Sequence, residues 1–400
     1  MKLLFVADGR SPIALNWITY FISRGDEVHL ATTFPCMALE GLASQTDIPV
    51  AFSRASGPAA SAPGRAAGGA RAIKLRSAIR HWVGPLTIPP AARQLKQLIA
   101  RIRPDLVHAM RIPYEGMLAA ASDPGVPLLV SIWGNDFTLH APASPLMQHW
   151  TRRVLRRADA LQTDCWRDLR LAHALGFPDR RPELVVPGNG GIRPEIFHPQ
   201  RESESSSGRV AAFCQDISPD APVIVNPRGF RAYVRNDTFF RAVPLIRERH
   251  PGAVFLCPSM KGESEAEGWI RRVEAGDAVK LLPRLAPEEM AQVYHRSMIS
   301  VSVSEHDGTP NTLLEAMACD CYPVAGDLDS IGEWIEDGVN GSLVNPSSPE
   351  DLAGTVIAAI EGGESRERAL QYNRELIRDR AAQPQVMKKI TAFYELILGR

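Results

Sequence analysis

Short apolar runs alternate along the whole chain with longer stretches of helical period. The runs are rich in Val, Ile and Leu, which is typical of buried strands, and the alternation predicts βα units around parallel sheets. In the first half we expect strands at Lys2–Ala7, Glu27–Ala31, Leu106–His108, Pro127–Ile132, Ala160–Thr163 and Glu183–Val186. In the second half we expect them at Val223–Asn226, Ala253–Cys257, Val279–Leu282, Ile299–Ser304, Tyr322–Ala325 and Gly341–Val344.

A polar segment, Pro199–Gly208, separates the two series of strands. With 400 residues the chain can hold two cores, so we predict an α/β protein of two Rossmann-like, doubly wound domains, residues 1–195 and 196–384. The segment Ser53–Gly69 is rich in Ala, Gly, Pro and Ser and is expected to be an exposed loop. The stretch Gln385–Leu398 is helical in period and could pack on either domain.

Composition favours a soluble globular protein. The hydrophobic fraction is 45% and the charged fraction 22%, and no apolar run approaches the roughly 18 residues that span a bilayer. The opening segment Met1–Gly9 is interrupted by Asp8, so we interpret it as a buried strand rather than a signal peptide. The six cysteines are scattered and form no C-x-x-C pair, which predicts reduced thiols and a cytoplasmic protein without structural zinc.

The two halves differ in charge although the net charge is zero. Residues 1–200 hold 23 Lys and Arg against 15 Asp and Glu, and residues 201–400 hold 22 against 30. The basic half could meet an anionic acceptor or a membrane surface, but ordinary solvated faces would also explain the difference.

The most informative segment runs from Ile299 to Ala318. It reads as a β-branched strand, a turn at Gly308, and a helix with Thr309 at its N-cap and Pro310 at its first position. In a parallel sheet this junction lies at the ligand-binding edge, where free amides and the helix dipole suit a diphosphate. The residues expected there are Asp307, Gly308, Thr309, Pro310, Asn311, Thr312 and Glu315.

Each part of this segment suits one part of a nucleotide sugar. Glu315 can accept a hydrogen-bond pair from a ribose diol, and Asp307 would face the group on the second phosphate. Taken alone, the same residues could also be a turn and an ordinary capped helix.

Cations follow two other strands of the same half. Arg228 comes after Val223–Asn226 and Lys261 after Ala253–Cys257, so both should reach the same sheet edge, with Arg235 in the loop region of Arg228. Such cations can stabilise a leaving diphosphate in place of a metal. The formal D-x-D match at Asp327–Asp329 falls in a loop expected to be structural, so we predict no metal site and no cofactor.

With these residues in view, the sequence resembles the retaining glycosyltransferases of family four, which have the GT-B fold. The resemblance covers nearly the whole chain. Its strongest parts are Asp307–Ala318, Tyr322–Ala325, Glu333–Ile335, Asp337–Gly341 and Leu343–Pro346, supported by Leu106–Ala109, Trp133–Asp136, Arg156–Asp159 and Pro187–Ile192.

The resemblance implies a role for each matching position. The first domain, with the helix 385–400 packed back on it, would bind the acceptor, and the second domain would bind a nucleotide-sugar donor across a cleft. Asp307, Arg228 and Lys261 would be catalytic, Glu315 would hold the ribose, Arg235 the phosphates and Arg284 the base side. Gly9, Asn135 and Asp136 would lie on the acceptor side.

The sequence departs from the family pattern in two places. The first acid of the signature is Asp307 rather than Glu, and Ile13 stands near where some relatives have a histidine. These departures keep two alternatives open: a nucleotide-sugar-binding module with little turnover, and a sugar-nucleotide epimerase or phosphorylase on the same fold. A Rossmann dehydrogenase is disfavoured because no G-x-G-x-x-G follows the first strand.

The acceptor is expected to be a glycan, a lipid-linked molecule or a small molecule, with no nucleic acid as a partner. The basic stretch Arg71–Trp82 is helical in period, and one hypothesis is peripheral contact with the inner membrane face. The competing interpretation is a solvated helix that packs its apolar residues on the first domain.

Overall fold

A computed structural model describes residues 1–51, 53, 80–201, 208–231 and 233–400. The chain folds into two compact units, one of Met1–Gly191 with Val386–Arg400 and the other of Ile192–Gln385. Most of the predicted loop Ser53–Gly69, most of the basic stretch Arg71–Trp82 and residues 202–207 of the polar segment lie outside the described residues.

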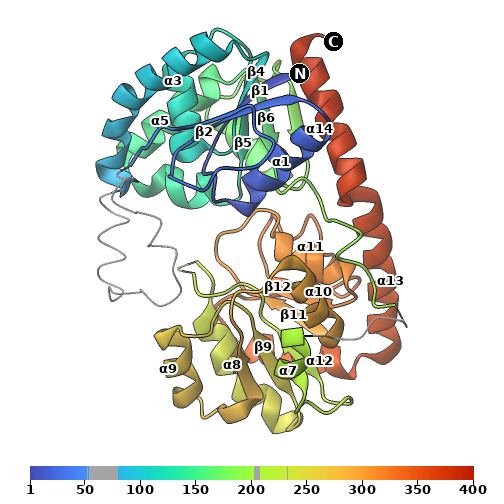
Figure 1. Cartoon of the computed structure of the whole chain (residues 1–400). Coiled ribbons are helices and arrows are strands. Elements are labelled where there is room, and N and C mark those ends of the chain that lie inside the picture. Colours follow the sequence, from blue (N-terminus) through green and yellow to red (C-terminus); the bar gives the residue numbers. More distant parts are fainter. Residues whose placement is uncertain (52, 54–79, 202–207, 232) are drawn as a thin grey trace. The chain divides into compact units, whose positions relative to one another are not determined.

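The first unit is built on a parallel sheet. Within the described residues it has seven strands in the order β3-β2-β1-β4-β5-β6-β7 (Figure 1). The strands are β1 (Lys2–Ala7), β2 (Glu27–Thr32), β3 (Ser44–Asp47), β4 (Leu106–Ala109), β5 (Leu128–Ile132), β6 (Ala160–Thr163) and β7 (Glu183–Val185). The sequence pattern missed β3 because its four residues, Ser-Gln-Thr-Asp, are polar and form the half-exposed edge of the sheet.

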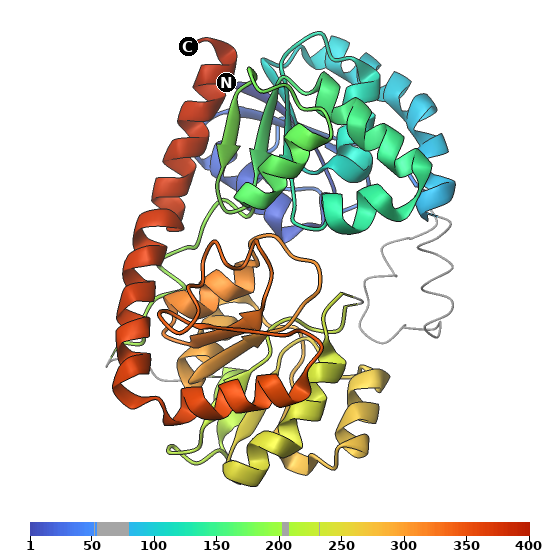
Figure 2. The ribbon, with the colours of Figure 1, turned by 180° about the vertical axis from the view of Figure 1, so that it is seen from behind.

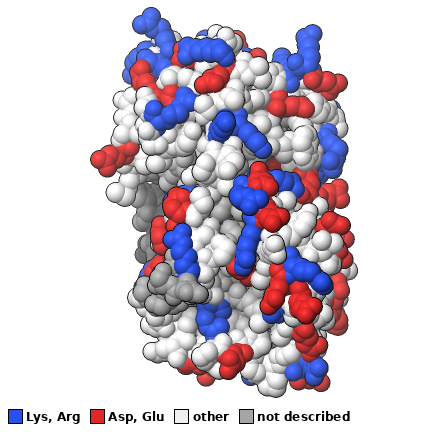
Figure 3. Space-filling model, turned by 90° about the vertical axis from the view of Figure 1, so that its right-hand side faces the viewer, with Lys and Arg blue, Asp and Glu red and all other residues white. Residues whose placement is uncertain are grey.

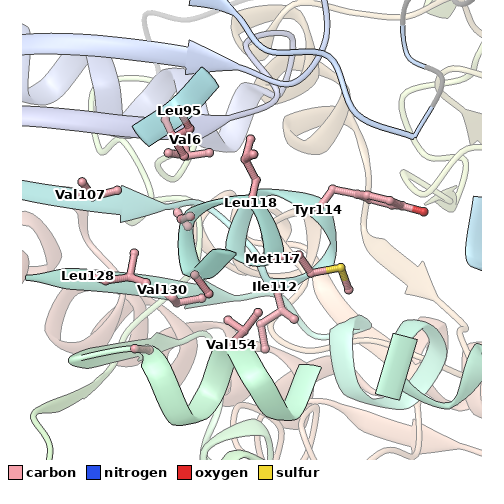
Figure 4. Packing of buried hydrophobic residues seen from close by; sticks show 14 of the residues in the cluster. Val6, Leu95, Val107, Ile112, Tyr114, Met117, Leu118, Leu128, Val130 and Val154 are labelled. Atoms are coloured by element: carbon pink, nitrogen blue, oxygen red, sulfur yellow. The ribbon is translucent and has the colours of Figure 1, made fainter. Parts of the chain in front are cut away.

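Helices cover both faces of this sheet. They are α1 (Pro12–Ser23), α3 (Ile88–Ile102), α4 (Met117–Ser122), α5 (Pro145–Arg157), α6 (Trp166–Ala174) and α14 (Gln383–Leu398), with short helical turns η3 (Gly84–Thr87), η4 (Ile112–Gly116), η5 (Asp136–His140) and η6 (Ala141–Ala143). One core lies between the sheet and α3, α4 and α5; Figure 4 shows Val6, Leu118 and Val154 from three of these elements. The other core lies under α1 and α14, where the ring of Phe21 stacks on Tyr394 at 4.7 Å.

The second unit repeats this plan. Within the described residues its sheet has six parallel strands in the order β10-β9-β8-β11-β12-β13. The strands are β8 (Val223–Val225), β9 (Val254–Cys257), β10 (Val279–Leu281), β11 (Ile299–Ser302), β12 (Tyr322–Gly326) and β13 (Ser342–Val344).

The helices of the second unit are α7 (Gly208–Cys214), α8 (Asn236–Arg249), α9 (Ser264–Arg272), α10 (Pro287–Arg296), α11 (Asn311–Ala318), α12 (Pro349–Glu361) and α13 (Gly363–Arg380), with the turn η7 (Gly276–Ala278). One core joins the sheet to α8, α9 and α12 (Figure 2). The other joins it to α10 and α11. The prediction of two doubly wound parallel sheets is confirmed.

Each sheet has one point at which the chain reverses the direction in which strands are added. In the first unit the chain runs outward from β1 to β2 and β3, and returns to place β4 on the other side of β1. In the second unit the same reversal lies between β8 and β11. Loops diverge above the carboxyl ends of the strands at such switch points, which is where open α/β sheets bind ligands.

Among the described residues, no helix is long and apolar enough to cross a bilayer. On the face in Figure 3, Lys and Arg side chains lie among Asp and Glu side chains, so the opposite net charges of the two halves do not form a large one-sign patch there.

Candidate active site

The loop between β11 and α11 reaches the switch point of the second sheet. The helix begins at Asn311, with Pro310 at the N-cap and no side-chain cap. The prediction that Thr309 caps the helix is therefore wrong, because its hydroxyl accepts a hydrogen bond from the indole of Trp334 at 2.9 Å. That bond ties the loop to Trp334, and the hydroxyl of Ser330 donates a second bond to the carbonyl of Asp307 at 2.7 Å.

Arg228 and Asp307 meet across the switch point. Arg228 follows β8, and its guanidinium lies 2.6 Å from the Asp307 carboxylate and 3.3 Å from the hydroxyl of Thr312. Ser304 donates to the same carboxylate at 2.7 Å. The Arg228 and Asp307 side chains are only 9% and 13% exposed. The sequence prediction that these two residues share one sheet edge is consistent with this geometry.

The charge of Arg228 is held in place by its surroundings. Burial lowers its pKa, but the charge and hydrogen bond of Asp307, together with Tyr233 and Tyr294, raise the pKa by more, so the net shift is upward and the group stays a cation. Its Nε–H is buried and has no hydrogen-bond partner among the described residues. A buried donor without a partner is rare in folded proteins, and here it lies beside the first turn of α11.

Glu315 lies one turn into α11 against the hydroxyl of Tyr294. The two oxygens are 3.4 Å apart, and the same hydroxyl is 3.4 Å from the carbonyl of Thr312. Burial raises the pKa of Glu315 to about 7, against the opposing effects of the Tyr294 hydrogen bond and of Arg193 and Arg228. Tyr294, on α10, was not singled out from the sequence; its only signal is its position on the apolar face of a helix.

The other predicted cations are placed differently. Arg235 is bound by Asp237 at 2.9 Å and Glu305 at 2.7 Å, which engages it with two carboxylates. Lys261 and Arg284 are exposed and follow β9 and β10, one and two strands away from β8 in the sheet order. Of the predicted cations, Arg228 is the one that lies against Asp307 within the described residues.

The predicted acceptor-side residues lie at the corresponding edge of the first sheet. Gly9 donates its amide to Thr32 at 3.0 Å, and a Cβ there would lie 2.5 Å from the sulfur of Cys36, so a larger residue in the turn after β1 would force the Cys36 side chain to move. Asp136 is fully buried, and its carboxylate accepts from Arg111 at 2.7 Å. Asn135 accepts from Arg111 at 3.2 Å.

Sequence reasoning missed Arg111 and the cavity beside it. The cavity measures about 230 Å³ and is lined by residues that follow β1, β4 and β5, together with Phe34 and Arg80. The backbone after β4 is strained, since Tyr114 has φ 71°, a conformation uncommon for a non-glycine residue. The sequence Pro-Tyr-Glu-Gly is typical of an ordinary turn, so it does not indicate that this loop is strained or that it borders a cavity.

One buried group has side chains of metal-ligand type. The ligand atoms of Asp164, Cys165 and Asp168 lie within 4.8 Å of one another. However, Asp168 is paired with Arg167 at 2.7 Å, and Asp164 accepts from the amide of Gly134 at 3.2 Å. Burial raises the pKa of the Cys165 thiol, which disfavours the thiolate that metals prefer. The group fits an internal hydrogen-bond cluster better than a metal site.

Comparison with known families matches both units. Residues 213–376 match the family Glycosyl transferases group 1, and residues 9–188 match the Glycosyl transferase 4-like domain. The first match contains the Arg228–Glu315 site, and the second contains the cavity beside Arg111.

Individual relatives are distant. A D-inositol 3-phosphate glycosyltransferase of Rhodococcus erythropolis is 25% identical over 228 residues, which is 55% of this chain and 50% of that protein. The chain thus matches about half the length of this curated relative.

Solved structures show the same fold over the whole chain. Sucrose-phosphate synthase from Thermosynechococcus elongatus superposes with a TM-score of 0.75 at 14% identity, covering 100% of both chains. Anabaena Alr3699/HepE in complex with UDP and glucose gives a TM-score of 0.73 at 14% identity, covering 99% of both chains.

Proposed function

Because this chain belongs to the family-four glycosyltransferases and has their GT-B fold, we propose that it transfers a hexose from a nucleoside diphosphate sugar to a hydroxyl group of an acceptor. HepE is described with UDP and glucose, which makes UDP-glucose the first donor to test here. Several curated relatives, including that of Rhodococcus erythropolis, are named for D-inositol 3-phosphate, which is therefore one acceptor to test beside glycans and lipid-linked molecules.

The observation that carries the proposal is the enclosed Arg228 beside the first turn of α11. Its Nε–H, which has no hydrogen-bond partner among the described residues, and the amides of Asn311 and Thr312 in the first turn of α11 offer donors at one place, and the helix dipole adds positive potential. These are the groups that bind a diphosphate. Asp307, held by Arg228 and Ser304, would then contact the sugar on the second phosphate.

Glu315 would select the ribose. A carboxylate one turn above the helix N-terminus can accept two hydrogen bonds from the 2′- and 3′-hydroxyls. The Tyr294 hydroxyl orients the carboxylate from the side away from the solvent. Arg235, Lys261 and Arg284 would contribute more weakly, because Arg235 is engaged by carboxylates and the other two are exposed.

The proposed reaction proceeds with retention and needs no metal. The bond between the sugar C1 and the β-phosphate oxygen breaks, and its electron pair passes to the diphosphate, where Arg228 and the helix amides stabilise the charge. The acceptor oxygen attacks C1 from the side of the leaving group and gives its proton to the departing phosphate. The products are the glycoside and the nucleoside diphosphate.

The test is a product assay with UDP-glucose and a panel of acceptors, in buffer with and without EDTA. We expect an acceptor-dependent glucoside with the anomeric configuration of the donor, formed at the same rate with EDTA. Release of glucose 1-phosphate would indicate a phosphorylase, an isomerised donor would indicate an epimerase, and UDP-glucose binding without turnover on any acceptor would indicate a binding module. Each of these three results would contradict the proposal.

The proposed place of action is the cytoplasm, with peripheral contact at the inner membrane face. The support is the basic stretch Arg71–Trp82, whose last residue, Trp82, is 58% exposed and is followed by the exposed Leu86. Sedimentation with liposomes tests it: binding should increase with anionic lipid, and indifference to lipid charge would contradict it.

A further inference from the structure

The cavity in the first unit is lined by three arginines that the donor site does not use. Arg10 follows β1, Arg111 follows β4, and Arg80 approaches from the segment before α3. Since the switch point of this sheet lies between β1 and β4, Arg10 and Arg111 flank it. The cavity therefore occupies the place where an open α/β sheet binds its ligand.

The arginines are arranged around aromatic rings. The guanidinium carbon of Arg10 lies 3.9 Å from the centroid of the Phe34 ring, and that of Arg80 lies 5.6 Å from the same centroid. Arg111 lies over Trp133 at 5.1 Å. Stacking on a ring holds a guanidinium in position, and carboxylates hold Arg10 and Arg111 further: Arg10 donates to Asp8 and Arg111 to Asp136.

The negative charges at the cavity do not balance the arginines completely. Asp8 pairs with Arg10 at 3.0 Å, and the buried Asp136 pairs with Arg111 at 2.7 Å. Among the described residues, no carboxylate pairs with Arg80. Burial raises the pKa of the remaining acid, Glu115, against the opposing effect of Arg111, which favours its neutral form.

Two further groups point to an anionic ligand. The indole N–H of Trp133, a residue that lines the cavity, is buried and has no hydrogen-bond partner among the described residues. Ser11, also in the lining, caps α1, so the positive end of a twelve-residue helix faces the same region. A phosphate group presents several oxygens at once and can use guanidinium, indole and helix donors together, whereas a neutral sugar cannot use the charge.

We propose that this cavity binds a phosphate group of the acceptor, so that the chain transfers its sugar to a phosphorylated molecule. The proposal rests on the transferase function proposed above, for which it names the acceptor class. The phosphate could belong to a soluble phosphate ester or to a lipid headgroup, and both would present the same chemistry to Arg10, Arg80 and Arg111.

Direct binding tests the cavity independently of turnover. Calorimetric titration with myo-inositol 3-phosphate is compared with titration by myo-inositol, and sedimentation with vesicles containing phosphatidylinositol 4-phosphate is compared with vesicles containing only neutral lipid. The variants are Arg80→Gln and Arg10→Gln, which remove exposed guanidiniums without uncovering a buried carboxylate. The matched control is Arg93→Gln, an exposed arginine of α3 outside the cavity lining.

We expect the phosphorylated probe, soluble or lipid-borne, to bind at least about tenfold more tightly than its counterpart without phosphate, and each cavity variant to remove about tenfold of that preference. Arg93→Gln should bind like the wild type, and UDP binding should be unchanged in all three variants. Preference for the soluble ester identifies a soluble acceptor, and preference for the vesicles identifies a lipid.

Equal binding of phosphorylated and unphosphorylated probes, or an equal loss in Arg93→Gln, would overturn the proposal. The outcome is separable from that of the transferase assay. Phosphate binding without sugar transfer would contradict the proposed function and leave the cavity assignment standing. Transfer to neutral acceptors alone would support the proposed function and contradict the cavity assignment.

Discussion

At the switch point of the second sheet a single arginine is enclosed, whereas at that of the first sheet three arginines line an open cavity. Arg228 is 9% exposed and tied to Asp307, but Arg10 and Arg111 are 35% and 24% exposed. An enclosed, pre-positioned cation stabilises a transition state most strongly where negative charge develops during the reaction. Partly exposed cations suit an anion that is already charged in solution. This contrast fits the proposal that the second switch point serves catalysis and the first serves recognition of the acceptor.

This contrast predicts opposite kinetic effects. Removing a cation at the second switch point should lower kcat, and removing one at the first should raise the KM for the acceptor.

The largest effect is expected from Arg228→Gln. The variant keeps hydrogen-bond donors but loses the charge opposite the leaving diphosphate, so kcat should fall by about 100- to 1000-fold. Initial-rate kinetics with UDP-glucose measure this. Arg271→Gln, an exposed arginine at the end of α9, is the matched control and should keep the wild-type kcat. A fall confined to KM would show that Arg228 only binds the donor.

The next effect is on stability, from Asp136→Ala. The buried carboxylate accepts hydrogen bonds from Arg111 and from the amide of Ile112, and both donors lose this acceptor when the carboxylate is removed. We expect the free energy of unfolding to fall by about 3 kcal/mol. Urea unfolding measures the loss, and Asp179→Ala, whose side chain is 96% exposed, should change little. An unchanged stability would mean that Asp136 does not organise the cavity wall.

A smaller effect is expected from the titration of Glu315. Its pKa of about 7 means that the carboxyl is protonated below pH 7, whereas the ribose diol requires the carboxylate as acceptor, so binding must release a proton. UDP-glucose affinity should therefore rise about tenfold from pH 6 to pH 8. Glu315→Gln cannot titrate, so its UDP-glucose affinity should not change between pH 6 and pH 8. Donor affinity that falls as pH rises would contradict this role.

The smallest effect is expected from Arg235→Gln. Two carboxylates already neutralise this side chain, so its loss should change UDP-glucose affinity by less than about threefold. Calorimetric titration compares it with Arg228→Gln. A larger loss of UDP-glucose affinity than in Arg228→Gln would show that Arg235 leaves its ion pairs to bind the phosphates. The second switch point would then use two cations rather than one.

The sequence predicted the fold well because buried parallel strands leave a strong apolar pattern. All the expected strands are present, and the one that was missed, β3, carries four polar residues at a sheet edge. The start of α11 was misplaced by one residue because the hydroxyl of Thr309 serves Trp334, twenty-five positions away. No local pattern reveals that bond.

The two sites differed in how far the sequence could predict them. Most of the donor site comes from one continuous segment, Asp307–Glu315, so the order of its residues already suggested their roles. Arg10, Arg80 and Arg111 are spread over a hundred residues and meet only when the sheet places β1 beside β4. Glu115 likewise gave no signal, because its burial depends on the turn at Tyr114.

The most direct test of the central claim is a crystal structure of the chain with UDP bound. The account predicts a diphosphate oxygen within about 3 Å of the Nε of Arg228, beside the amides of Asn311 and Thr312, with Glu315 on the ribose. A diphosphate bound away from the β8–β11 switch point, with the Nε–H of Arg228 still without a partner, would contradict it.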